Sequence, residues 1–129
     1  MEDSFTYFGK PVAKPRMVRS DKYKKRPVVL NYWAFKDRLN MQAKAANFKL
    51  CNMYKVTFVM PFPEKLSEKK KKEYLGKPHQ VRPDVDNMLK ALNDCMLEED
   101  SAVWYVVAKK VWGREGKIIV ENFPDNLDF

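Results

Sequence analysis

Apolar and polar residues follow one another along this 129-residue chain in patterns that predict an α/β (α+β) fold. Short runs rich in β-branched and aromatic residues, typical of strands, occur at 4–8, 54–60, 103–112 and 117–123. The last two runs flank a glycine-containing segment at 113–116 and are expected to pair as a β-hairpin. Helical spacing predicts helices at 30–46, near 67–75 with Ser67 as its cap, and from Pro83 onward. These elements predict a small mixed sheet packed with helices.

Each of the two longer predicted helices has an apolar side that is expected to face the core. In the first helix the positions that recur at roughly helical intervals are Trp33, Leu39, Ala43 and Ala46, with Phe35 alongside. In the second they are Val85, Met88, Leu89, Leu92 and Met96. On the opposite side of the second helix, Asp86, Lys90 and Asn93 lie within about 60° of one another. Trp33 is interpreted as a core residue rather than a platform for nucleic-acid bases.

Composition and charge narrow the class of partner. With 45% hydrophobic residues the chain has enough apolar surface for a continuous core, and residues 1–129 are predicted to form a single domain with a polar tail at 124–129. Lys and Arg outnumber Asp and Glu by 25 to 17, which gives a net charge of +8, and a basic loop spans 10–27. A basic face binds polyanions because each neutralised phosphate releases condensed counterions. The charge favours a nucleic-acid partner, although a merely basic protein remains an alternative.

Other functional classes are disfavoured by residue content. Cys51, Cys95 and His79 are too few to build a zinc site in one chain, and His79 is interpreted as a loop residue rather than a catalytic base. The N-terminus has no basic region followed by an apolar stretch, and no apolar run approaches the roughly 20 residues of a membrane helix. We therefore expect a cytoplasmic protein with no membrane partner.

The candidate catalytic residues lie where the second long helix begins, in the segment Arg82-Pro83-Asp84-Val85-Asp86-Asn87. Helix capping and the helix dipole account comfortably for one aspartate there. Two aspartates, followed by Lys90 and by an acidic cluster at 98–100, also suit Mg²⁺, a hard ion that prefers oxygen ligands and keeps several waters. Two interpretations stay open for Asp84 and Asp86, a solvated helix start and a metal site that also uses Asp100.

These motifs resemble the RusA family of Holliday junction resolvases, whose pattern is Pro-Asp-x-Asp-Asn, two apolar residues, Lys, and a later Asp before x-x-Val. The resemblance spans roughly residues 9–112, and it rests on Lys14-Pro15-Arg16, on the segment from Arg82 to Asp94, on Glu99-Asp100-Ser101-Ala102-Val103 and on a strand with Lys109. One position departs from the pattern. Family members commonly carry two aspartates before x-x-Val, whereas the first acid here is Glu99, which keeps the charge on a longer arm.

The resemblance implies a homodimeric, Mg²⁺-dependent endonuclease of phage or prophage type, with Mn²⁺ as a substitute, that nicks four-way DNA junctions in pairs during recombination and repair. It implies catalytic roles for Asp84, Asp86, Lys90 and Asp100, the three aspartates being metal ligands. Lys90 would meet the charge of the pentacovalent phosphate, or form an ion pair with Asp86, or both. The residues expected to contact DNA phosphates are Lys14, Arg16, Arg19 and Arg82.

Two other functions are compatible with the same residues. The first is a nuclease that acts on flaps, replication forks or plain duplex, which would use the same metal chemistry on a different substrate. The second is a non-catalytic DNA-binding protein whose acids only cap and solvate a helix. Loss of cutting on replacing Asp84, with DNA binding retained, would exclude the second.

Overall fold

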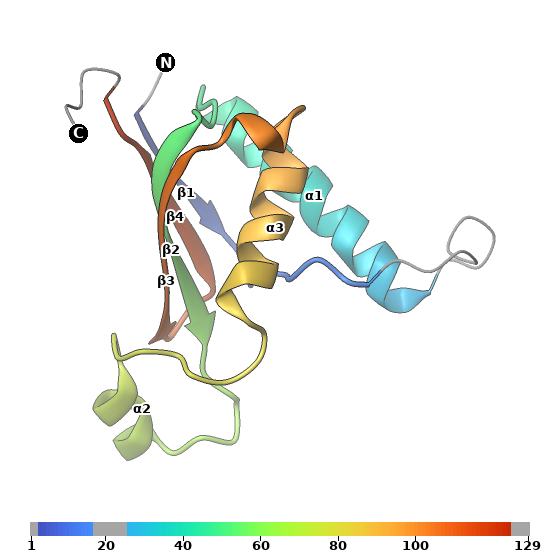
Figure 1. The fold of residues 1–129 in the computed structure, drawn as a ribbon. Helices are drawn as coiled ribbons and strands as arrows, with labels where there is room; N and C mark the ends of the chain where they lie inside the picture. Colours follow the sequence, from blue (N-terminus) through green and yellow to red (C-terminus); the bar gives the residue numbers. More distant parts are fainter. Residues whose placement is uncertain (1–2, 17–25, 125–129) are drawn as a thin grey trace.

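The computed structural model describes residues 3–16 and 26–124, in which helices cover one face of a four-stranded sheet (Figure 1). The strands are β1 (Ser4–Phe8), β2 (Met53–Pro61), β3 (Tyr105–Gly113) and β4 (Lys117–Asn122). The helices are α1 (Pro27–Ala45), α2 (Glu68–Tyr74) and α3 (Val85–Met96), and a 3-10 turn, η2 (Asp100–Ala102), precedes β3. Each strand and helix predicted from the sequence is present, so the α+β fold class is confirmed.

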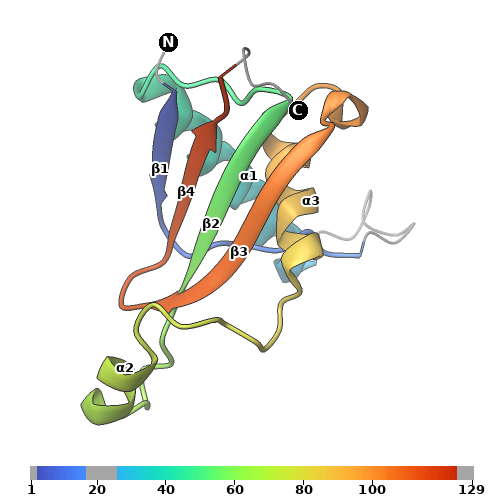
Figure 2. The same cartoon turned by 60° about the vertical axis from the view of Figure 1, so that its left-hand side comes forward.

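The sheet has the order β1-β4-β2-β3, so β2 lies between β4 and β3 (Figure 2). β2 pairs with β3 in parallel and with β4 in antiparallel. The predicted hairpin of β3 and β4 is therefore wrong, because the segment between them crosses the end of β2. A Cβ atom on Gly113 would lie 2.3 Å from Cγ1 of Val59, so the crossing requires a glycine there.

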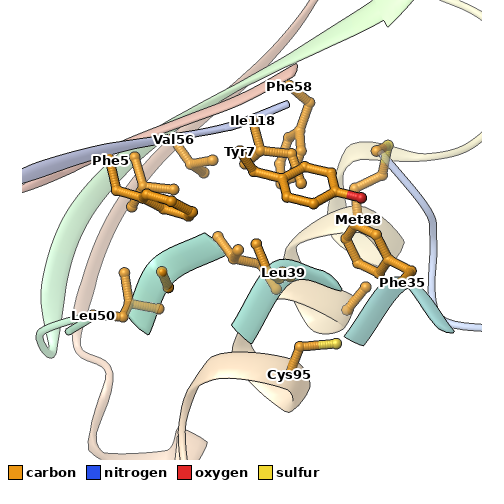
Figure 3. Packing of buried hydrophobic residues seen from close by; sticks show 14 of the residues in the cluster. Phe5, Tyr7, Phe35, Leu39, Leu50, Val56, Phe58, Met88, Cys95 and Ile118 are labelled. Atoms are coloured by element: carbon orange, nitrogen blue, oxygen red, sulfur yellow. The ribbon is translucent and has the colours of Figure 1, made fainter. Parts of the chain in front are cut away.

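The core lies between the sheet and the two long helices, α1 and α3 (Figure 3). Its buried side chains include Phe5, Tyr7, Val56, Phe58 and Ile118 from the sheet and Phe35, Leu39, Met88 and Leu92 from the helices. Tyr7 meets Phe35 edge to face, with 5.4 Å between the ring centroids. This packing holds α3 against the sheet and so sets the position of the exposed aspartates at its start.

The buried faces of α1 and α3 are rotated from the predicted ones. On α1, Tyr32 is buried and Trp33 is 40% exposed, so the interpretation of Trp33 as a core residue is wrong. On α3, Cys95 is buried and Val85 is 37% exposed. The cause is that the two helices also pack against each other, as the 3.6 Å contact from Tyr32 Oη to Cys95 Sγ shows.

Some of the sequence predictions fall outside the described residues. These are the part of the basic loop at 17–25, with Arg19 and Tyr23, and the tail from 125 onward. The described part of the loop reaches α3, where the Lys14 backbone N–H donates to the Asn87 carbonyl at 3.4 Å. None of the helices described between residues 26 and 124 is long and apolar enough to cross a membrane.

Candidate active site

Asp84 stands at the N-cap of α3, but its carboxylate does not cap the helix. Its backbone has the extended N-cap geometry (φ −67°, ψ 145°), and its carbonyl accepts the first helical hydrogen bond from Met88 N–H at 3.2 Å. Its side chain accepts no hydrogen bond from the first turn. Asp86 follows in that turn, and both aspartates are exposed. Capping therefore accounts for where the chain turns at Asp84 but leaves the carboxylate available.

The loop that carries Asp84 is held by Lys110 of β3. The Lys110 ammonium donates to the carbonyl of Val81 at 2.7 Å and also to the carbonyl of Pro83. The Lys110 carbonyl accepts from the His79 backbone N–H at 3.0 Å. Lys110 was missed by sequence reasoning, because its place in register with the buried Phe58 and its contacts with the loop are set only by the fold.

Asp84 and Asp86 line an open hollow together with the cations Arg82 and Lys110. The remainder of the lining comes from Gln80, Val81 and Val85. Acidic and basic side chains thus lie side by side, so the hollow offers oxygen ligands to a cation and positive charge to a phosphate. Hydrolysis of a phosphodiester needs both.

Lys90 lies one helical turn beyond Asp86 and is exposed. The structure shows no ion pair between Lys90 and Asp86, nor between Lys90 and any other described residue. Of the two roles considered for Lys90, the ion pair is therefore absent here. Its ammonium remains available to a ligand at the same end of α3.

Asp100 does not lie beside Asp84 and Asp86. Most of α3 lies between them, and its rise from Asp86 to Met96 corresponds to about 15 Å along the helix axis. Within residues 3–16 and 26–124, no three His, Cys, Asp or Glu side chains lie close enough to hold one metal ion. The predicted trio of aspartates is therefore not assembled within one chain.

Glu99, where the sequence departs from the family pattern, has a structural role. Its carboxylate Oε1 accepts a hydrogen bond from the Ser101 backbone N–H at 3.2 Å and so caps η2. This hydrogen bonding holds the pKa of Glu99 below its ordinary value. The longer glutamate arm thus stabilises the turn that carries Asp100.

Lys14, expected to bind DNA, is paired within the protein. Its ammonium lies 3.3 Å from Asp94 Oδ1, and the hydroxyl of Tyr32 donates to Asp94 Oδ2 at 2.6 Å. This network ties the N-terminal segment to α1 and α3. Arg16 and Arg82 are exposed, and the Arg16 carbonyl accepts from Arg26 Nη2 at 2.9 Å. The two arginines are therefore better placed than Lys14 to reach a phosphate.

Replacing Asp94 by asparagine is expected to lower the unfolding free energy at pH 7 by about 1 kcal/mol, because the Lys14 pair is lost while Tyr32 keeps an acceptor. Partial burial acts to raise the pKa of Asp94, but the hydrogen bonds from Tyr32 and Lys14 outweigh it and lower the pKa. A lowered pKa stabilises the fold above the unfolded-state value of about 3.9 and loses that effect as the pH falls through the folded value.

Urea unfolding of Asp94→Asn and of the unmodified chain measures this difference at pH 7 and at pH 3. The gap between the two proteins should narrow at pH 3. Asp37→Asn, at an exposed position on α1, is the matched control and should follow the unmodified chain at both pH values. An undiminished gap at pH 3 would show that the charge of Asp94 is not what stabilises the fold.

The carboxylates of Asp84 and Asp86 fit a hard divalent ion. Neither carboxylate is used by a hydrogen bond or an ion pair with another described residue, and both open into the same hollow. Mg²⁺ is commonly bound in proteins by one or two carboxylates, with waters and substrate phosphates completing its coordination. Two aspartates at the start of α3 therefore suffice as protein ligands from one chain.

Replacing Lys110 by methionine is expected to slow any reaction at the hollow by about tenfold, because the Val81 and Pro83 carbonyls lose the group that positions Asp84. The measurement is phosphodiester hydrolysis against Mg²⁺ concentration, and the Mg²⁺ concentration that gives half of the maximal rate should rise. Lys44→Met, at an exposed position in the last turn of α1, is the control and should leave that concentration unchanged. An unchanged metal requirement in Lys110→Met would show that Lys110 does not position Asp84.

A known protein family matches most of this chain. The model of the family described as Endodeoxyribonuclease RusA matches residues 9–121, which is most of the chain. The matched range includes β2, β3 and the whole of α3 with Asp84, Asp86 and Lys90. A search of curated proteins finds no match.

Proposed function

The chain belongs to the RusA family of endodeoxyribonucleases, a family that resolves Holliday junctions, and from that premise we propose that it makes paired, Mg²⁺-dependent nicks in four-way DNA junctions. The observation that supports this most is the N-cap aspartate, Asp84, whose carboxylate forms no capping bond and opens beside Asp86. We further propose that it serves recombination and repair in the cytoplasm of a bacterial host of a phage or prophage.

The residues of the hollow have distinct roles in the proposed reaction. Asp84 and Asp86 would hold Mg²⁺, and Mn²⁺ in its place. Such an ion, when bound, lowers the pKa of an attacking water and neutralises charge on the phosphate. Arg82 would orient a phosphate oxygen, since its guanidinium presents two donors side by side. Lys90, unpaired on the next turn, would stabilise the additional negative charge of the pentacovalent phosphate.

The position of Asp100 supports a dimeric form of the site. The rise of α3 from Asp86 to Met96, about 15 Å, separates Asp86 from the turn that carries Asp100, so the two do not bind one ion within a chain. A C2 dimer with the α3 helices of its two copies antiparallel would place the partner's Asp100 near Asp84 and Asp86. The same symmetry would create two equivalent sites for two equivalent strands of a junction.

Cleavage of a synthetic four-way junction and of a linear duplex with the same sequence tests the proposal. We expect Mg²⁺-dependent nicks at symmetric positions on two strands of the junction, and much slower cutting of the duplex. Equal rates on both substrates would instead show a nuclease that does not distinguish a four-way junction from a duplex. Absence of nicking in both Mg²⁺ and Mn²⁺ would favour the non-catalytic DNA-binding protein.

A further inference from the structure

The segment between β2 and α3 forms an arm whose two ends are fastened to Trp112 of β3. At the start of the arm Phe62 stacks on Trp112, with 5.5 Å between ring centroids and 11° between the planes. Near its end the buried His79 packs on the same indole at 4.2 Å. Backbone hydrogen bonds from Gly76 N–H to the Trp112 carbonyl and from Trp112 N–H to the Lys77 carbonyl, both 2.9 Å, close the base. The arm is thus a defined part of the fold.

The helix in this arm, α2, does not contribute to the core. None of its seven residues is buried, and in both views it projects beyond the end of the sheet (Figures 1 and 2). It is held instead by polar contacts. Arg114 Nη1 lies 3.1 Å from Glu68 Oε2, Lys71 Nζ lies 3.7 Å from Glu68 Oε1, and Ser67 caps the helix through a 3.3 Å bond from Lys70 N–H. Apolar burial therefore does not explain why the chain builds α2.

α2 contains four lysines and two glutamates and so keeps a net positive charge. Glu68 is engaged by Arg114 and Lys71, whereas Lys69, Lys70 and Lys72 are exposed and form no ion pair with any described residue. One further acid, Glu73, lies among them. Three unpaired ammonium groups on seven residues repel one another, which a nearby polyanion would relieve.

The arm is also placed next to the candidate active site. From α2 the chain passes through residues 75–83 directly to Asp84. Lys110, two residues before Trp112 in β3, binds the last part of this segment. α2 and the start of α3 lie toward the same end of the molecule (Figure 1). α2 therefore lies toward the end of the molecule at which the hollow would hold a phosphate.

We propose that α2 binds the phosphate backbone of the duplex arm next to the cut site, through Lys69, Lys70 and Lys72. The inference rests on the proposed function for the position of the DNA, but it concerns a separate surface. It assigns to the lysine run a role in substrate binding, in place of the solvated face that such runs usually form.

Salt-dependent binding of a four-way junction in EDTA tests the proposal without any cleavage. Converting the three lysines to glutamine should reduce the slope of log affinity against log salt by about 2 to 3, because each lost phosphate contact changes it by about 0.9. The matched control removes the same charge at the opposite end of the sheet, in Lys44→Gln, Lys49→Gln and Lys55→Gln. Its slope should change by less than 1.

A second variant separates charge from damage to the fold. Lys69→Arg, Lys70→Arg and Lys72→Arg together keep the charge and should keep the slope, and thermal unfolding monitors the fold of every variant. Equal slope changes in the α2 glutamine variant and in the control would overturn the inference. The outcome is independent of nuclease activity, since a chain that fails to cut junctions can still lose salt-dependent binding through α2.

Discussion

Replacing Asp84 by asparagine is expected to slow junction cleavage by about a thousandfold, equivalent to about 4 kcal/mol of transition-state stabilisation, with junction binding kept within a few-fold. Asparagine has nearly the shape of aspartate and is an equally good N-cap residue, so α3 should form as before. The loss of cleavage rate would therefore come from removing the charge of the Asp84 carboxylate, which forms no capping hydrogen bond in the structure. The measurement pairs single-turnover cleavage in Mg²⁺ with junction binding in EDTA.

The control for this experiment is Asp37→Asn, which removes one negative charge from an exposed position on α1. It should cleave at the unmodified rate, because it changes net charge by the same amount without touching the hollow. Asp84→Asn that cuts as fast as Asp37→Asn would contradict the metal-ligand role of Asp84. The residue would then be a backbone N-cap and nothing more.

Much of the fold could be predicted because burial and secondary structure leave local patterns. The alternation in β2, with Val56, Phe58 and Met60 buried, matches the strand prediction closely. The position of β4 could not be predicted in this way. A strand beside β3 and a strand beside β2 need the same alternation, and only the tertiary packing that inserts β2 between them decides.

In the candidate site, too, some residues could be predicted from local sequence and others could not. Asp84 and Asp86 could be proposed from the sequence because they lie two positions apart at the start of a predicted helix. Lys110 was missed because it meets the Val81 and Pro83 carbonyls only once β3 has folded beside the loop, a contact between residues almost thirty positions apart. The local sequence pattern suggests the proposed ligands, whereas the group that holds their loop is set by the topology.

Two variants that are each inactive are expected to regain cleavage when they share a dimer, provided that each site combines Asp86 of one copy with Asp100 of the other. Asp86→Asn and Asp100→Asn each damage both sites of a homodimer. In the mixed dimer one site carries both changes and the other carries neither. In a preparation of mixed dimers alone, half of all sites are therefore intact, which should restore about half of the unmodified nicking rate.

The measurement uses co-expressed chains with two different tags, purified through both tags so that only mixed dimers remain. These dimers have one working site, so they should release singly nicked junctions rather than symmetrically resolved products. Mixing Asp84→Asn with Asp86→Asn is the matched control, because both changes lie at the start of α3 and every mixed site would lack one ligand. Recovery in the first mixture alone would place Asp100 across the interface from Asp84 and Asp86. Full activity of Asp100→Asn by itself would remove Asp100 from the site and leave the two aspartates of the α3 start as its ligands.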